Sequence, residues 1–151
     1  MRTKKHASWM LIAFVAACTS GGDGGAASRS ARAARAHGDI VVAVAWPWSA
    51  HADTHFGDGL QLAADEINAT GGVDGRHIVL VRYDDHESVN DGRIVAQKIA
   101  ANLDAVAVIG HLQSYVTVPA AAIYDLAGLV LVAPTATDPA LTEQGYTTVF
   151  R

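Results

Sequence analysis

The sequence predicts an α/β fold in which helices cover both faces of an open, mostly parallel β-sheet. Half of the 151 residues are hydrophobic, which is enough material for one core of ordinary size. Short apolar runs alternate along the chain with segments of helical periodicity. The connections between these segments are short, and strand–helix–strand units of this kind form right-handed crossovers between parallel strands.

Five apolar runs predict the strands of the sheet. The first run is continuous, as expected for a strand that is buried on both faces. The predicted strands span residues 40–45, 77–83, 105–109, 129–132 and 147–150. Ligands bind beyond the carboxyl ends of strands in open sheets of this kind, so the loops after the first four strands are expected to form the site.

Helical periodicity predicts a helix after each of the first two strands. The first has apolar residues at i, i+3, i+4 and i+7 counted from Leu60, and it ends at Gly71 and Gly72. The second begins with a pair that resembles a capping box, Ser88 and Asp91. Both helices therefore have one apolar face to bury against the sheet.

Pro119 predicts where the third helix begins. Proline lacks a backbone N–H, so it belongs in the first turn of a helix. The helix is therefore expected to start near Val116 or Thr117 and to end at Gly128. This start leaves Ser114 in the preceding loop.

The first eighteen residues have the pattern of an export signal. Three basic residues within the first five precede an unbroken apolar run over residues 9–17, which is too short to span a bilayer and suits a secretory signal peptide. Small residues directly before Cys18, the only cysteine, resemble the lipobox of bacterial lipoproteins. That resemblance implies a signal peptide over residues 1–17 and a lipid on Cys18. A plain signal peptide followed by an incidental cysteine is the alternative.

Residues 18–38 are predicted to form a flexible tether that separates this signal from a folded domain over residues 39–151. The segment is rich in Gly, Ala and Ser and has no apolar stripe. Arg29, Arg32 and Arg35 are spaced for one helix face and could contact anionic lipid headgroups. The composition favours a solvated linker instead.

The charge distribution excludes nucleic acid as a partner. Residues 1–38 carry six of the eleven basic residues and one of the fifteen acidic residues. The remainder is therefore strongly acidic, whereas a nucleic-acid-binding domain needs a basic footprint.

Enzyme motifs are absent. The loop after the first predicted strand lacks Gly-x-Gly-x-x-Gly, and the sequence contains neither a P-loop nor a Gly-x-Ser-x-Gly elbow. Asp84 and Asp85 follow the second strand and are interpreted as a solvated turn or a helix-capping pair. No metal or other cofactor is predicted.

A metal-dependent enzyme is the alternative from another functional class. His51, Asp53 and His55 share one loop, and His86 could complete a four-ligand zinc site with them. Polar loop residues are the competing interpretation of these side chains.

Short hydrogen-bond donors follow the third and fourth predicted strands. Gln113 and Ser114 lie in the first of these loops, and Thr135 and Thr137 lie in the second. Because the loops adjoin at the sheet edge, their hydroxyl and backbone N–H groups could together hold a carboxylate. Capping and turn formation are the alternative roles for Ser and Thr here.

An ordered set of motifs resembles the leucine/isoleucine/valine-binding proteins of bacterial ABC importers. The segments that carry the resemblance are VIGHLQS at 108–114, APTATDPALT at 133–142, DEINATGGVDG at 65–75, FGDG at 56–59, YDD at 83–85 and residues 145–151. The resemblance covers residues 39–151. It implies the N-terminal lobe of a type 1 periplasmic-binding-protein fold with flavodoxin-like strand order, in a protein whose two lobes trap a ligand between them.

The resemblance also implies roles for individual residues. Ser114 and Thr137 would hydrogen-bond the ligand carboxylate, and Phe56 would lie over the ligand side chain. The remaining expected ligand contacts are Leu112, Gln113, Thr135 and Trp48. Thr135 replaces a small apolar residue and Trp48 enlarges the first loop, so the ligand class extends to other amino acids and amides.

The expected function is therefore the extracytoplasmic, membrane-anchored binding component of an importer for branched-chain or related amino acids. An ABC permease would be its membrane partner, and it would not be an enzyme. A ligand-sensing input domain of a receptor is the alternative. The sequence stops where the crossing to a second lobe would begin, so an incomplete cleft and weak ligand binding are expected.

Overall fold

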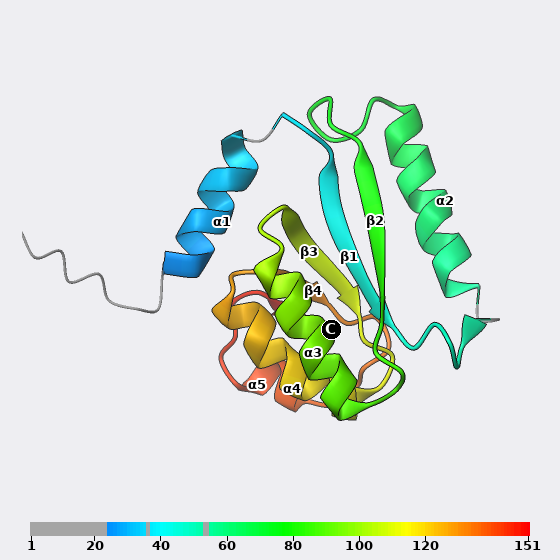
Figure 1. Ribbon diagram of the computed structural model, residues 1–151, viewed down its shortest axis with the longest axis vertical. Coiled ribbons are helices and arrows are strands. Elements are labelled where there is room, and N and C mark those ends of the chain that lie inside the picture. Colours follow the sequence, from blue (N-terminus) through cyan, green and yellow to red (C-terminus); the bar gives the residue numbers. More distant parts are fainter. Residues whose placement is uncertain (1–23, 36, 53–54) are drawn as a thin grey trace, which may run out of the picture.

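A single parallel sheet organises the chain. The structure is a computed structural model that describes residues 24–35, 37–52 and 55–151. The sheet has five strands in the order β2-β1-β3-β4-β5, and every neighbouring pair is parallel (Figure 1). The strands are β1 (Ile40–Trp46), β2 (Ile78–Asp84), β3 (Ala105–Gly110), β4 (Val130–Val132) and β5 (Val149–Phe150).

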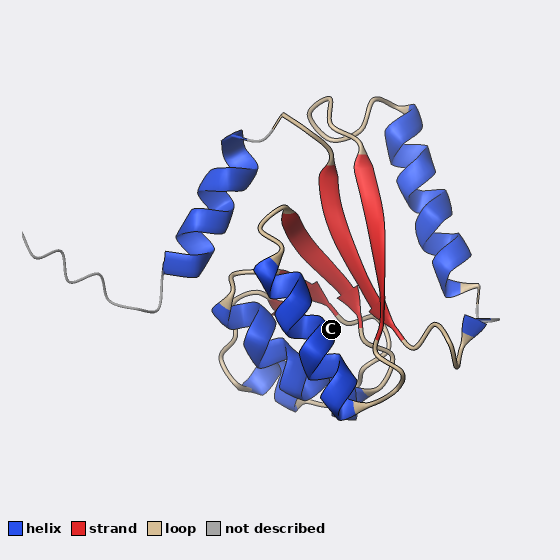
Figure 2. Cartoon of the chain, in the orientation of Figure 1, coloured by secondary structure: helices blue, strands red, loops and turns tan. Residues whose placement is uncertain are grey.

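Helices pack on both faces of this sheet, as Figure 2 shows by colour. The chain moves from β1 to β2 in one direction and from β2 to β3 in the other, so right-handed crossovers place the two connecting helices on opposite faces. The helices are α1 (Gly24–Arg35), α2 (Phe56–Ala69), α3 (Val89–Ala101), α4 (Ser114–Leu126) and α5 (Ala140–Glu143). The predicted α/β fold and its flavodoxin-like strand order are therefore confirmed.

The start of α4 differs from the prediction. The helix begins at Ser114, and Pro119 lies inside it. The absent N–H of Pro119 removes one bond to the carbonyl of Tyr115. The Thr117 hydroxyl donates to the carbonyl of Gln113 at 2.8 Å, a carbonyl that also accepts from the backbone N–H of Thr117. Ser114 is thus a first-turn helix residue, and Gln113 is the N-cap.

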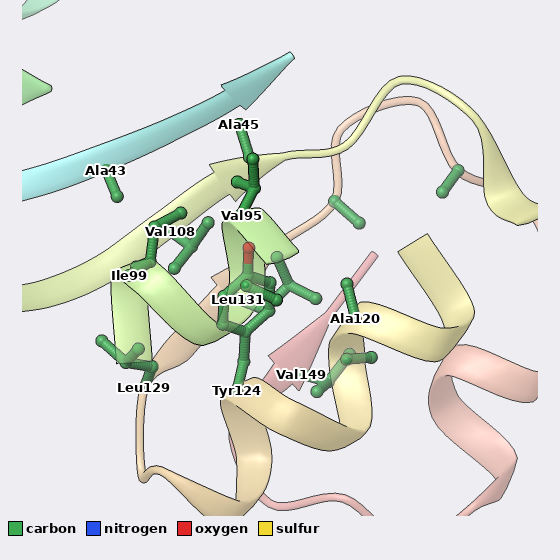
Figure 3. Close-up of a cluster of buried hydrophobic side chains, with 14 of the residues drawn as sticks. Ala43, Ala45, Val95, Ile99, Val108, Ala120, Tyr124, Leu129, Leu131 and Val149 are labelled. Carbon is green, nitrogen blue, oxygen red and sulfur yellow. The ribbon is translucent and has the colours of Figure 1, made fainter. Parts of the chain in front are cut away.

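The principal core lies between the sheet and the helices α3, α4 and α5. Strands β1, β3, β4 and β5 direct small and branched side chains toward it, and α3 and α4 contribute alanines together with larger side chains (Figure 3). The fully buried phenol ring of Tyr124 is among these larger side chains. The core members drawn with labels are Ala43, Ala45, Val95, Ile99, Val108, Ala120, Tyr124, Leu129, Leu131 and Val149.

The opposite face of β4 and β5 presents apolar side chains at the surface. Neighbouring residues of a strand point to opposite faces. Leu131 is fully buried, whereas Val130 and Val132 are 38% and 42% exposed. Phe150, which is in register with Val132, is 55% exposed. The two faces of this half of the sheet are therefore buried to very different degrees.

Helix α1 occupies a segment for which the composition predicts a flexible linker. Ala and Arg both have high helix propensity, so this segment can be helical without an apolar stripe. The helix contacts the lobe through Arg29, which is 4% exposed. No helix within the described ranges is long and apolar enough to cross a bilayer.

Arg29 joins the ends of two helices. Its Nη2 donates to the carbonyl of Ala100 at 2.6 Å, and its Nη1 donates to those of Asn102 and Ala105 at 2.8 and 2.6 Å. Its Nε donates to the carbonyl of Ala127 at 3.1 Å. Asn102 and Ala127 are the C-caps of α3 and α4, where unpaired carbonyls carry partial negative charge. Burial lowers the pKa of Arg29, yet the guanidinium remains the natural cation for such a site.

Leu131 and Val132 provide a matched test of the two sheet faces. We expect Leu131→Ala to lower the free energy of unfolding by about 2–5 kcal/mol, because it leaves a cavity in the core. Val132→Ala should change it by less than about 1 kcal/mol, because that side chain is already partly in water. Urea denaturation measures both values, and equal losses would contradict the assignment of the faces.

Arg29 provides a test of the α1 contact. Arg29→Met removes the donors to four carbonyls and should lower the free energy of unfolding by about 1.5–3 kcal/mol. Arg35→Met, an exposed position on the same helix, is the control and should change it by less than about 0.5 kcal/mol. If both variants unfold at the wild-type denaturant midpoint, α1 does not stabilise the lobe.

Candidate functional site

The candidate site lies at the carboxyl edge of the sheet. Because all five strands are parallel, the loops after β1, β2, β3 and β4 emerge at the same edge (Figure 1). Gly110 ends β3 with φ of 139°, and a side chain there would collide with the carbonyl of Ala45 on β1. The backbones of β1 and β3 therefore approach closely directly beneath the site.

Hydrogen bonds from Thr135 and Thr137 join the loop after β4 to the segment after β3. The Thr135 hydroxyl donates to the carbonyl of Leu112 at 2.8 Å. The backbone N–H of Thr137 donates to Oγ of Ser114 at 3.1 Å. The structure thus brings together four of the residues that the sequence predicts for a ligand site, and it places them at the rim, where they are half-buried or exposed.

The hydroxyl of Ser114 can still donate a hydrogen bond. Its oxygen already accepts from Thr137, so its own hydroxyl hydrogen is left to donate elsewhere. Ser114 is also the first residue of α4, where backbone N–H groups have no partner in the helix and the helix dipole favours negative charge. Chemically, this rim can hold a carboxylate.

Gln113 lies at the same rim but turns toward the loop after β2. Its Nε2 donates to Oε1 of Glu87 at 2.7 Å. The other carboxylate oxygen of Glu87 lies 3.5 Å from Nε2 of His51. Glu87 thus connects the loops after β1, β2 and β3, and the sequence analysis missed it because no local pattern marks the residue.

Phe56 and Trp48 form an aromatic cluster with Trp46. The ring of Phe56 stacks on that of Trp46 with centroids 3.8 Å apart and planes 21° apart, and it is tilted against Trp48 at 6.3 Å. The Arg82 guanidinium lies over Trp48, 4.6 Å from the ring centre, as in a cation–π contact. Both indole N–H groups are buried and lack a hydrogen-bond acceptor within the described ranges. Within the described residues, no ring contact or hydrogen bond joins this cluster to Ser114.

Asp84 and Asp85 differ in their exposure to solvent and in their hydrogen-bond partners. Burial alone would raise the pKa of Asp84, but hydrogen bonds from the backbone N–H groups of His86 and Ser49, with the Ser49 side chain and the charge of His86, outweigh it and lower the pKa. Asp84 is the last residue of β2 rather than a residue after it, and its carboxylate accepts from the backbone of the turn that follows. For Asp85 the solvated interpretation is wrong, because this side chain is only 1% exposed.

Asp85 is buried because it contacts His111. Its Oδ2 lies 2.5 Å from Nδ1 of His111, whose ring is fully buried. The other ring nitrogen lies 3.1 Å from the hydroxyl of Tyr124. Burial, with the nearby charge of Asp85 and the phenol of Tyr83, raises the pKa of Tyr124, so this phenol keeps its proton. The residue after β2 and the residue after β3 thus meet a residue of α4 in the interior, next to the rim.

The histidines of the metal alternative contact different carboxylates. His86 lies 3.4 Å from Asp84, and His55 lies 3.1 Å from Asp58. Asp53 falls outside the described residues, as do Cys18 and the predicted signal peptide. Within residues 24–35, 37–52 and 55–151, the structure has no group of three or more His, Cys, Asp or Glu side chains that could hold a metal ion.

Comparison with known proteins identifies the family. The family described as periplasmic binding protein matches residues 48–151. An amino acid binding protein of Pseudomonas aeruginosa is 38% identical over 117 residues, which are 75% of this chain and 31% of that protein. A Leu/Ile/Val-binding protein of Citrobacter freundii is 41% identical over 112 residues, which are 74% of this chain and 30% of that protein.

Solved structures show the same relationship. An ABC transporter substrate-binding protein from Desulfitobacterium hafniense, in complex with Leu, superposes with a TM-score of 0.72 and 48% identity. The superposition covers 75% of this chain and 33% of the chain in that structure. The chain spans about a third of the length of the relatives that it matches. The family match, the sequence identities and the shared sheet together show that the chain belongs to the periplasmic binding protein family.

Proposed function

We propose that this chain is the N-terminal lobe of an extracytoplasmic solute-binding protein that delivers branched-chain or related amino acids, or amides, to an ABC permease. The observation that supports it most directly is the pairing of Ser114 with Thr137 across two adjacent strand-end loops. Relatives named as Leu/Ile/Val-binding proteins share this part of the chain. In this proposal the lobe binds its ligand and catalyses no reaction.

The rim would bind the ligand through its carboxylate. In the described conformation the Thr137 N–H is satisfied by Ser114. An arriving carboxylate could accept from the free Ser114 hydroxyl, from the first-turn N–H groups of α4 and from the hydroxyl of Thr137. The Thr135 hydroxyl is already committed to Leu112, so we propose that Thr135 acts by holding the loop, while Leu112 and Gln113 line the wall.

The aromatic cluster would form the side of the cleft that meets the ligand side chain. Phe56 and Trp48 supply apolar surface there, in keeping with an apolar or amphipathic ligand. Phe56 is fixed by its stacking on Trp46, so the shape of this wall is set before the ligand binds. The facing wall of the cleft would come from a second lobe.

We also propose the division of the chain into a lipoprotein signal peptide over residues 1–17, a tether over residues 18–38 and the lobe over residues 39–151. Support comes from the apolar run before Cys18 and from the family match, which begins at residue 48. Helix α1 would lie in the tether and fold back onto the lobe through Arg29. Lipid on Cys18 would hold the protein at a membrane surface beside its permease.

Leucine binding tests the carboxylate site. Titration of the 151-residue chain with leucine, followed by NMR, should shift the backbone amides of Ser114 and Thr137 in a saturable manner. Weak binding is expected if the cleft has only one wall. Ser114→Ala and Thr137→Ala should each weaken binding by about tenfold to a hundredfold, because a hydrogen bond to a charged group contributes about 1.5–3 kcal/mol.

Two controls make this titration specific. Thr70→Ala removes a hydroxyl that bonds the carbonyl of Ile67 at the end of α2, and it should leave the leucine-induced shifts unchanged. 3-Methylbutylamine has the leucine side chain without the carboxylate and should not shift the two amides. Equal shifts with leucine and this amine would refute the carboxylate site.

The anchor is tested separately in a bacterial host. Cys18→Ser should abolish labelling by a radioactive lipid precursor and release the protein from the membrane fraction, because only a thiol can accept the lipid. Thr19→Ser, the adjacent conservative change, should leave labelling intact. Labelling of the Cys18→Ser variant at the wild-type level would exclude the lipoprotein assignment.

A further inference from the structure

A buried polar cluster lies beneath the proposed site and has no role in the binding steps above. Its members are Asp85, His111 and Tyr124, which are 1%, 0% and 0% exposed. Buried polar side chains without hydrogen bonds destabilise a fold, and a satisfied network makes one arrangement of its parts more favourable than others. The cluster therefore restricts the positions of the backbone segments that carry its side chains.

His111 is held from two sides by separate elements. Its Nδ1 lies 2.5 Å from Asp85 in the loop after β2, and its Nε2 lies 3.1 Å from the Tyr124 hydroxyl on α4. Asp85 is itself fixed, since its Oδ1 accepts from the backbone N–H of Glu87 at 3.0 Å. The imidazole and phenol rings are inclined by 23° with centroids 6.0 Å apart. These contacts fix both the position and the plane of the imidazole.

The backbone of His111 leads directly into residues 112–114, the segment proposed to contact the ligand and called the ligand loop below. Its carbonyl lies 3.4 Å from the Thr135 hydroxyl, which makes its shorter bond, 2.8 Å, to the next carbonyl, that of Leu112. Three residues after His111, Ser114 accepts from the N–H of Thr137. Any rotation of the His111 backbone would therefore shift the acceptors on which the loop after β4 is aligned.

A second connection runs from the same aspartate to the same loop. Asp85 holds the backbone of Glu87, and the carboxylate of Glu87 accepts from Gln113 at 2.7 Å. Asp85 thus reaches the ligand loop by two routes, through His111 and through Glu87. Neither route requires Asp85 to contact a ligand.

We infer that His111 is a positioning residue for ligand binding: held between Asp85 and Tyr124, it sets the loop of residues 112–114 at the height and angle at which Ser114 and Thr137 meet the same carboxylate. This inference rests on the proposed function, because it concerns the same site. It assigns an effect on binding to Asp85 and Tyr124, which lie in the interior rather than at the rim.

Three variants of the full 151-residue chain test the inference. Asp85→Asn keeps the side-chain shape and removes its charge, and Tyr124→Phe removes only the hydroxyl that faces His111. Tyr146→Phe is the matched control, because its hydroxyl donates to Gln144 at 2.7 Å away from the site. Urea denaturation shows whether each variant remains folded, and Tyr124→Phe keeps the experiment decisive if Asp85→Asn does not fold.

The decisive readouts are the NMR signals of Thr135 and Thr137, which lie on another loop, and the leucine titration. We expect Tyr124→Phe and Asp85→Asn to shift these amide signals and to weaken leucine binding by about tenfold, the equivalent of one hydrogen bond. Tyr146→Phe should do neither. Folded variants that lose stability but keep wild-type Thr135 and Thr137 signals and wild-type leucine affinity would overturn the inference.

Failure of the proposed function gives a different result. If the wild-type chain shows no leucine-dependent shift at Ser114 or Thr137, the carboxylate site is refuted. The ligand-free signals of Thr135 and Thr137 then still decide whether His111 positions this loop, because they require no ligand. Unchanged signals in both interior variants would refute the positioning role as well.

Discussion

The contact between His111 and Asp85 is the interaction on which the edge of this sheet depends. It joins the residue after β3 to the residue after β2, across the intervening strand β1. Both side chains are excluded from water, so each needs the other to satisfy its polar atoms. Tyr124 extends the contact into α4. The loops at the rim are thus attached to a polar cluster that has little freedom to rearrange.

Next to this cluster, the lobe is stabilised by an ordinary hydrophobic core. Small residues on β1 let the strands and the helices α3 and α4 approach closely, and the larger side chains of Ile99, Leu131 and Tyr124 fill the space between them. Gly110 shows how close the approach is, since a Cβ there would collide with the Ala45 carbonyl. Dense packing of this kind leaves the polar rim as the part of the lobe that can respond to a ligand.

The two ends of the sheet satisfy backbone polarity in opposite ways. At the carboxyl end, the start of α4 leaves N–H groups that attract an anion. At the other end, the carbonyls that close α3 and α4 converge on the guanidinium of Arg29. The same helix dipoles that favour a carboxylate at the proposed site favour an internal cation at the opposite end.

The sequence by itself determined the order of the five strands and of the helices α2, α3 and α4, the parallel sheet and the position of the loops after β3 and β4. These follow from local patterns, because apolar periodicity and Gly or Pro signals are properties of short segments. It also placed Ser114 near Thr137, since parallel strands end at one edge. The resemblance to the branched-chain amino acid binders rests on the same ordered motifs and is confirmed by the family match.

Only the tertiary structure decided which polar residues are buried and what they contact. Asp85 has the local context of a turn residue, like Asp84, and its burial depends on a histidine 26 residues away in the chain. The docking of Arg29 on α3 and α4 is likewise a contact between distant segments. The helix α4 begins at Ser114, five residues before the proline that was expected in its first turn. Contacts of this kind form because the fold brings the residues close together, and a short stretch of sequence does not include both partners.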